Sequence, residues 1–366
     1  MAERILFSAR AGFESARQLA AHAGGERAQR LHGHSFVATV RAELAPGWAG
    51  FAGGEVDALR KRLQDSVRPL DYRLLNEILE EPHDSGLADW IAARLELPGW
   101  ERVGVRSAPG AGIDLDREGR AHLWRRYRFE AAHRLPNVRA GHKCGRMHGH
   151  GFEVVLHAAL GRDRDRSGAR ELAEELDRVW APLHAQLHQA CLNEIPGLEN
   201  PTSEMIATLV WRRVQSSLPQ LAWVTVHETA DCGAHYNGQR HGIWTEVTLD
   251  SALRLRRAPP ADPRSRMHGH TYGLRLHLSA PLDQVLGWTV DFGDVKEIFG
   301  PVFLALDHHP LDELPGIDDA DAESVARWVR AQAAEQLPQL DRIDLYETPG
   351  TGAILSWGGQ PPAFVV

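Results

Sequence analysis

Three histidines and a cysteine near the middle of the chain have the spacing of a catalytic metal site. His148 and His150 begin a stretch in which apolar residues alternate with other residues over positions 152–158. This period of two predicts a β-strand, so the two imidazoles point to the same side. A second strand ending at His133 would bring a third imidazole beside them, as in the open three-ligand arrangement of a catalytic zinc site. Cys144 would then lie next to the metal as a candidate base rather than as a ligand.

The overall composition narrows the possible functions. The 366 residues carry a net charge of −8 and have no broad basic surface, which disfavours binding to nucleic acid. The N-terminus has no signal-type apolar run, and no window reaches the length of a membrane span, so we expect a cytoplasmic protein without a membrane partner. Three cysteines in a chain of this size argue against a disulfide framework.

Internal repetition gives weight to the histidine pattern. A single His-Gly-His is weak evidence, because two polar residues at the start of a strand are common. Here the tripeptide occurs three times, at residues 32–34, 148–150 and 268–270, with offsets of 116 and 120 residues. These offsets are close to one third of the chain and predict three units, at residues 1–121, 122–240 and 241–366.

The elements that must position these residues can be read most clearly in the second unit. After the strand at 148–158, apolar residues from Leu172 to Leu187 recur at mostly three- and four-residue spacing, which predicts a helix that Pro182 kinks or splits. Thr202 is a candidate N-cap for a second helix, and residues 223–228 predict a closing strand. Each unit is therefore expected to be β-β-α-α-β-β.

The units differ at the positions where chemistry is expected. Arg17 and Leu253 stand at the position of His133, and Ala28 and Arg264 stand at the position of Cys144. Only the second unit can therefore form a three-histidine site from this pattern.

The third unit alone has an adjacent acid and histidine after its first predicted helix, Asp307 and His308. The first and second units have Asp71-Tyr72 and His188-Gln189 there. The second and third units would thus supply different parts of one site, with the first unit serving mainly as structure.

Three segments, residues 129–136, 141–150 and 192–204, resemble 6-carboxytetrahydropterin synthase. That enzyme belongs with 6-pyruvoyltetrahydropterin synthase in the tunnelling-fold superfamily. The four-residue step from Cys144 to His148 fits the carboxy branch better than the pyruvoyl branch. The resemblance is close in the middle third and extends in pattern to the outer thirds.

The resemblance implies an α+β fold in which three β-β-α-α-β-β units close a twelve-stranded antiparallel barrel with helices outside. Here one chain would complete the ring, and closure would remove the edge strands that a lone unit exposes. Rings of this family stack in pairs, which is compatible with a homodimer of stacked rings. The sequence does not determine whether this chain forms one ring or such a pair.

The resemblance also implies a site built between neighbouring units. His133, His148 and His150 would hold one Zn²⁺ per chain, and Cys144 would be the catalytic thiol. Asp307 and His308 would be the catalytic pair from the next unit. The carboxylate that anchors the pterin would be Glu228 or Glu347, since both stand in a Glu-Thr dipeptide near the last strands.

The expected reaction converts 7,8-dihydroneopterin triphosphate to 6-carboxytetrahydropterin, acetaldehyde and triphosphate. Lys143, Arg146 and Lys296 are candidates for contacting the triphosphate. A pyruvoyl-type synthase that retains the three-carbon side chain is one alternative, and a pterin-binding ring without turnover is another. The family usually functions in queuosine biosynthesis, but the sequence does not determine the end product of the pathway.

Overall fold

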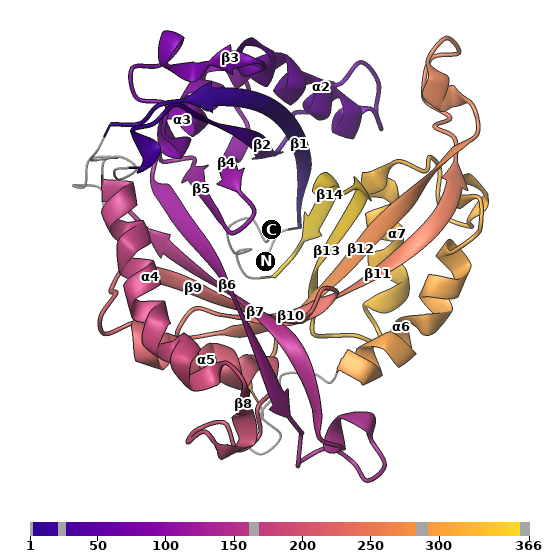
Figure 1. Ribbon diagram of the computed structural model, residues 1–366. Coiled ribbons are helices and arrows are strands. Elements are labelled where there is room, and N and C mark those ends of the chain that lie inside the picture. The colour runs from indigo at the N-terminus through magenta and orange to yellow at the C-terminus, as the bar shows by residue number, and fades with distance from the viewer. Residues whose placement is uncertain (1–2, 21–26, 161–167, 283–291, 359–366) are drawn as a thin grey trace.

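The computed structural model describes residues 3–20, 27–160, 168–282 and 292–358. Three similar sets of elements follow one another along the chain, as Figure 1 shows by colour. The first set is β1 (Arg4–Arg17), β2 (His32–Ala42), α2 (Glu55–Val67), α3 (Asp84–Leu95), β4 (Trp100–Ala108) and β5 (Ala111–Asp116). The second is β6 (Ala121–His133), β7 (His148–Ala159), α4 (Gly168–Leu187), α5 (Ser203–Val214), β9 (Leu221–Thr229) and β10 (Cys232–Tyr236). The third is β11 (His241–Leu253), β12 (His268–Leu278), α6 (Phe292–Leu306), α7 (Ala322–Ala333), β13 (Leu340–Thr348) and β14 (Thr351–Ser356).

The twelve long strands form one closed antiparallel barrel, because the last strand pairs with the first. β14 lies beside β1 from the pair Arg4–Ser356 to the pair Ser8–Gly352. The two-residue strands β3 (Arg73–Leu74) and β8 (Ala190–Cys191) lie parallel to the ends of β1 and β6. Closure leaves none of the twelve strands as a free edge. The predicted twelve-stranded barrel is confirmed.

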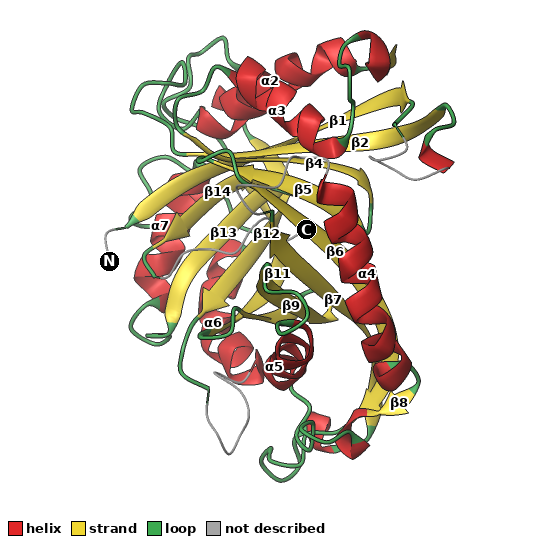
Figure 2. Cartoon of the chain, turned by 90° about the vertical axis from the view of Figure 1, so that its left-hand side faces the viewer, coloured by secondary structure: helices red, strands yellow, loops and turns green. Residues whose placement is uncertain are grey.

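The helices cover the outside of the barrel (Figures 1 and 2). On β13, Ile343 and Leu345 are buried in the apolar layer shared with the helices, whereas Arg342 and Asp344 alternate with them and face the lumen. The strand period of two therefore separates an apolar outer face from a polar inner face. α4 contributes the predicted apolar stripe, with Leu172, Leu176, Leu183 and Leu187 buried.

Two local predictions meet different outcomes. Thr202 is the N-cap of α5, as predicted, and its hydroxyl accepts a hydrogen bond from the N–H of Met205 at 3.2 Å. Pro182 lies inside α4 and does not split it, since the helix is continuous from Gly168 to Leu187. A proline removes only one backbone donor, and the buried leucines on both sides of it hold the helix against the barrel.

The expected unit boundaries fall next to the turns between units. Residue 121 is the first of β6, and residue 240 directly precedes β11. Among the described residues, no helix combines the length and the hydropathy needed to cross a membrane.

Candidate metal centre

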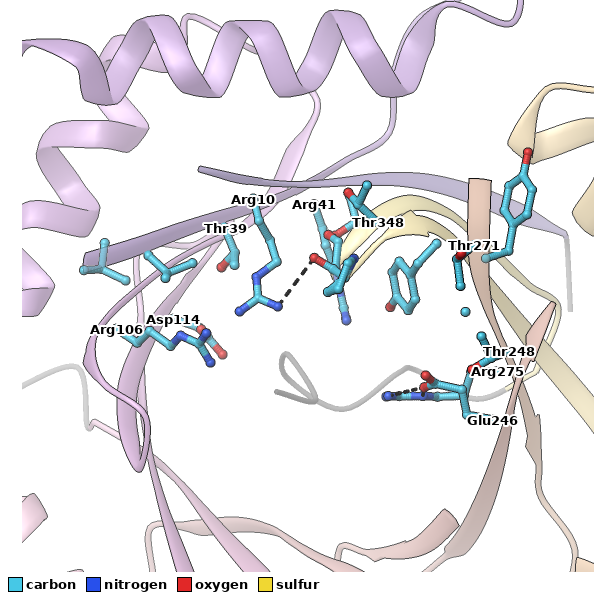
Figure 3. Close-up of a pocket in the computed structure, with 18 residues that line it drawn as sticks. Arg10, Thr39, Arg41, Arg106, Asp114, Glu246, Thr248, Thr271, Arg275 and Thr348 are labelled. Atoms are coloured by element: carbon cyan, nitrogen blue, oxygen red, sulfur yellow. Dashed lines mark hydrogen bonds and ion pairs between the residues drawn. The ribbon is translucent and has the colours of Figure 1, made fainter. Parts of the chain in front are cut away.

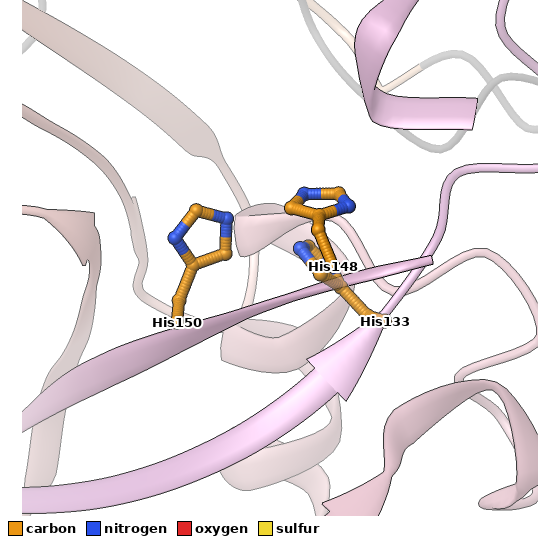
Figure 4. A group of neighbouring side chains, drawn as sticks. All are labelled: His133, His148 and His150. Atoms are coloured by element: carbon orange, nitrogen blue, oxygen red, sulfur yellow. The ribbon is translucent and has the colours of Figure 1, made fainter. Parts of the chain in front are cut away.

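The antiparallel pairing of β6 with β7 brings the three predicted histidines of the second unit together. His133 is paired with His148 in the register, and His150 follows two residues later on the same face. Their candidate ligand atoms all lie within 4.8 Å of one another. Figure 4 shows the imidazoles of the two strands facing one another. The sequence prediction that these three side chains form one cluster is therefore correct in its geometry.

Backbone carbonyls set the protonation of the cluster. The Nδ1 atom of His133 lies 3.0 Å from the carbonyl oxygen of Pro201, and that of His148 lies 2.8 Å from the carbonyl oxygen of Arg146. A carbonyl only accepts, so Nδ1 carries the proton and Nε2 keeps its lone pair. This is the tautomer that a metal requires.

Burial completes the fit to a metal. Among the described residues, the Nε2 atoms of His133 and His150 are buried and have no hydrogen-bond partner. Burial also lowers the pKa of both side chains below the ordinary histidine value, which keeps the imidazoles neutral near pH 7. Three imidazole nitrogen donors that leave one side open fit a catalytic Zn²⁺. Phe152 supports the cluster from below, with its ring 5.3 Å from that of His133 and 5.4 Å from that of His150.

A cavity of about 700 Å³ opens beside the cluster at the junction of the second and third units. His148 and His150 line it from the second unit, and Phe292 and Lys296 line it from the first turns of α6 in the third unit. The amino group of Lys296 lies 3.2 Å from the carboxylate of Asp231, which links the two units at the rim. Sequence reasoning did not assign Phe292 or Asp231 to the site, because their contribution depends on which units are neighbours in the ring.

Cys144 lines the same cavity from a short helical turn, Lys143–Gly145. Its carbonyl accepts a hydrogen bond from the N–H of Leu135 at 2.8 Å, and its N–H donates to Nδ1 of His142 at 3.3 Å. These two backbone contacts hold the turn that presents the thiol to the cavity.

A second thiol, Cys232, also lines the cavity, and sequence reasoning did not select it. Burial raises the pKa of Cys232 to about 11, so this thiol stays protonated at neutral pH. Its sulfur lies 3.0 Å from the hydroxyl oxygen of Thr229.

Glu228 is one of three carboxylate residues that line the cavity among the described residues, with Glu204 and Asp231. Its Oε2 accepts a hydrogen bond from the hydroxyl of Ser203 at 2.7 Å, and its Oε1 lies 3.6 Å from Nε2 of His150. Ser203 therefore fixes the carboxylate beside the metal cluster. The serine directly follows the N-cap of α5, a helix start that the sequence predicted without assigning this residue a role.

Glu347, the other candidate anchor, lies at the junction of the third and first units. Burial raises the pKa of Glu347 to about 7, and the negative charge of Asp57 is the second-largest cause of this rise. It is not among the described residues that line the cavity beside His148 and Cys144.

Asp307 and His308 form the predicted pair but do not reach this cavity. The Nδ1 atom of His308 lies 2.8 Å from the carboxylate of Asp307, whose pKa falls while that of His308 rises. Asp307 also accepts a hydrogen bond from the N–H of Asp250 at 2.9 Å, and the side chain of His308 is 75% exposed. Neither is among the described residues that line the cavity.

The course of α6 explains this separation. The start of the helix borders the cavity, whereas the acid-histidine pair follows its end at Leu306. A helix of 15 residues is roughly 22 Å long. The expectation that the pair completes the cavity within one ring is therefore not met by this structure.

Comparison with known proteins places this geometry in a family. The sequence profile of the 6-pyruvoyl tetrahydropterin synthase family matches residues 122–239 and 242–356. A 6-carboxy-5,6,7,8-tetrahydropterin synthase of Synechocystis sp. is 33% identical over 125 residues, covering 32% of this chain and 94% of the relative. A dihydroneopterin monophosphate aldolase of Pyrococcus furiosus is 29% identical over 94 residues, covering 25% of this chain and 79% of the relative.

Solved structures also match parts of the chain. The 6-pyruvoyl tetrahydropterin synthase of Caenorhabditis elegans aligns with a TM-score of 0.29 and 19% identity, over 32% of this chain and 95% of its own. A uricase from Bacillus fastidious aligns with a TM-score of 0.30 and 10% identity, over 73% of this chain and 92% of its own.

The two stretches matched by the family profile together make up more than half of the chain, and they cover the unit with the histidine cluster and the unit that closes its cavity. The chain therefore belongs to the 6-pyruvoyl tetrahydropterin synthase family, and the expectation of an enzyme of this lyase type is confirmed.

Proposed function

We propose that the chain converts 7,8-dihydroneopterin triphosphate and water to 6-carboxytetrahydropterin, acetaldehyde and triphosphate, with one Zn²⁺ held by His133, His148 and His150. The observation that carries this proposal is the cavity in which that cluster meets a thiol, Cys144, and a fixed carboxylate, Glu228. The identity of 33% to a relative named for this activity supports the carboxy branch.

Glu228 is proposed to bind the pterin ring. A pterin presents a guanidine-like edge with two adjacent N–H donors, which match the two oxygens of one carboxylate. The hydroxyl of Ser203 orients this carboxylate before substrate arrives, so little side-chain freedom is lost on binding. Oε1 of Glu228 lies 3.6 Å from Nε2 of His150, so a pterin bound to this carboxylate would lie beside the histidine cluster.

The remaining chemistry is proton transfer and charge stabilisation. Zinc, when bound, would stabilise negative charge on the hydroxyl oxygens of the substrate side chain. Cys144 is proposed to remove the proton from the adjacent C–H group, as a thiolate favoured by a nearby cation. Lys143, Arg146 and Lys296 line the cavity and are proposed to contact the triphosphate.

Asp307 and His308 are proposed to act at the cavity of a second ring. Both lie at the end of α6 nearest the His-Gly-His hairpin of the third unit, where Asp250 holds them. Large apolar side chains are exposed directly before each His-Gly-His, at Leu31 (66%), Met147 (54%) and Met267 (52%). Leu304 (68%) shortly precedes Asp307, and Tyr72 (82%) stands in the first unit at the position of His308. Such a surface favours association, and a face-to-face homodimer would allow the pair of one ring to reach a cavity of the other.

Acetaldehyde release separates the proposed activity from its alternatives. Incubation of the zinc-loaded chain with 7,8-dihydroneopterin triphosphate should yield acetaldehyde and triphosphate in equal amounts. Triphosphate without acetaldehyde would instead indicate the pyruvoyl-type reaction. Binding of the substrate without either product would indicate a pterin-binding ring. Cys191→Ala is a matched control for Cys144→Ala, because Cys191 is not among the described residues that line the cavity.

A further inference from the structure

A second cavity, of about 480 Å³, lies inside the barrel where the first and third units meet. Its walls come from the inner faces of β1, β2, β4, β5, β11, β12 and β13, and Figure 3 shows their polar side chains directed into the lumen. It shares none of the described lining residues of the candidate metal centre. Its chemistry can therefore be considered separately.

The charges in this cavity do not cancel. Four arginines line it, Arg10, Arg41, Arg106 and Arg275, together with two acidic residues, Asp114 and Glu246. The guanidinium group of Arg275 lies 2.6 Å from the carboxylate of Glu246, so that pair is neutral. The formal charge of the whole lining is therefore +2.

Arg10 and Arg106 account for the excess. Among the described residues, neither has a carboxylate within 4.0 Å, and the side chain of Arg10 donates only a long hydrogen bond of 3.5 Å to the carbonyl of Pro349. Figure 3 shows both guanidinium groups projecting into the lumen from opposite sides of β2.

Their surroundings make this arrangement costly without an anion. Burial lowers the pKa of both arginines, and the positive charge of Arg10 lowers the pKa of Arg106 further. Two like charges held close together in a partly dehydrated space repel each other, and an anion between them would relieve this repulsion. The hydroxyls of Thr39 and Thr348 line the same cavity and can donate to an oxyanion.

We propose that this cavity inside the barrel binds a small multivalent oxyanion, with Arg10 and Arg106 as its principal ligands. Guanidinium groups match the geometry of phosphate, since each can donate two parallel hydrogen bonds to two oxygens. Inorganic phosphate and inorganic triphosphate share this chemistry. The site is separate from the proposed lyase function and does not depend on it.

The test measures binding of each anion to the full chain by calorimetry, at constant ionic strength set with sodium chloride. Wild-type protein should bind one phosphate or triphosphate in the lumen, with the preferred anion identified by the lower Kd. Arg10→Gln and Arg106→Gln should each weaken this binding at least tenfold, and the double variant should abolish it. Arg106→Lys retains the charge but loses the forked geometry, so its Kd should lie between those of wild type and Arg106→Gln.

Two control variants locate the effect. Arg62→Gln removes an arginine on the outer surface that pairs with Glu96, and should leave binding unchanged. Lys296→Ala removes a cation from the candidate metal cavity, so an anion bound there would be lost in this variant while the lumen site persists. Without added anion, the Tm of Arg10→Gln should equal or exceed that of wild type, because one repelling charge is gone. Failure of phosphate and triphosphate to bind, or equal binding to wild type and the double variant, would overturn the proposal.

Discussion

The first and second units place different side chains, an arginine and a histidine, at the same point of the same fold. In the second unit, His133 donates from Nδ1 to the carbonyl of Pro201 and leaves Nε2 without a partner among the described residues. In the first unit, Arg17 occupies the equivalent position and donates from Nη1 to the carbonyl of Pro82 at 2.9 Å. Its Nη2 lies 3.3 Å from Nε2 of His34, the atom that corresponds to a candidate metal ligand. The guanidinium therefore supplies a fixed positive charge where the second unit offers nitrogen donors.

Near this position, each unit has a hydrogen bond from a serine to an acid that joins a helix to a strand. The element that carries the acid differs between the two units. In the second unit, Ser203 on α5 donates to Glu228 on β9. In the first, Ser107 on β4 donates to Asp84 on α3 at 2.7 Å, and Asp84 pairs with Arg17 at 2.6 Å. The same hydrogen bond is kept, but the carboxylate neutralises a protein cation instead of facing a cavity. The same backbone therefore supports an internal ion pair in the first unit and an open site in the second.

The third unit closes its equivalent region in another way. Leu253 takes the place of His133 and is buried. Arg264, at the position of Cys144, reaches Asp57 of the first unit at 2.8 Å and lies over the ring of Phe51 at 4.7 Å. An inter-unit ion pair therefore stands where the second unit presents its thiol.

Transferring the residue of the first unit to the second should have the largest effect. In His133→Arg, the guanidinium would lie among the remaining imidazoles and near Glu228, so we expect the chain to lose its zinc and its activity to fall at least about 1,000-fold. Metal analysis and acetaldehyde release measure both losses. His34→Ala, which removes the equivalent of His150 from the first unit, should leave one zinc per chain and normal activity. Retention of zinc by His133→Arg would show that the metal lies elsewhere.

Removing the charge of the anchoring acid should have a smaller effect on catalysis. Glu228→Gln keeps the size of the side chain but replaces one acceptor by a donor, which opposes the N–H edge of the pterin. Loss of one hydrogen bond to a charged group is worth about 1.5–3 kcal/mol, so kcat/KM should fall roughly 10- to 100-fold, mainly through KM. Glu347→Gln is the matched control, because Glu347 lies at the junction of the third and first units. An equal loss in both variants would contradict the assignment of Glu228.

Placing the histidine of the second unit at the equivalent position of the first should allow the first unit to bind a metal. Arg17→His would place a third imidazole beside His32 and His34, so we expect a second zinc per chain. Without zinc, loss of the largely buried pair with Asp84 should destabilise the chain by on the order of 3 kcal/mol. Added zinc should raise the Tm of Arg17→His but not that of Arg17→Ala, which removes the pair without restoring a ligand. One zinc per chain in both variants would mean that the first unit differs from the second by more than this residue.

The sequence predicted the parts of this structure that depend on local pattern. The period of two on either side of His148 predicted the hairpin, and its register determines that His133, His148 and His150 meet. The three copies of His-Gly-His predicted three units, and the resemblance to the tunnelling-fold enzymes implied that these units close one ring. The hairpin and the units followed from the strand period and the repeat, whereas the ring needed the resemblance.

Features that depend on the packing of units against each other were not predictable in the same way. Neither the period nor the repeat could show that the start of α6 borders the cavity while Asp307 follows its far end. Asp71 in the first unit accepts from the N–H of Glu14 just as Asp307 accepts from that of Asp250. An acid at this point therefore has a backbone role that sequence alone does not distinguish from catalysis.

The pH dependence of stability should distinguish the closed junction of the third unit from the open cavity of the second. Burial raises the pKa of Glu347 from 4.5 to about 7, so the folded chain holds a proton there that the unfolded chain releases between those values. Its contribution to stability is complete below about pH 4.5 and is lost as pH rises through about 7. Glu347→Gln, which is neutral throughout, should make the free energy of unfolding less dependent on pH in this window by on the order of 1 kcal/mol. Denaturant titrations at pH 5 and pH 8 measure the difference, with Glu118→Gln on the surface as a control. If wild type and Glu347→Gln lost the same stability between these two pH values, Glu347 would titrate as an ordinary exposed acid, and the junction would be more open than its packing indicates.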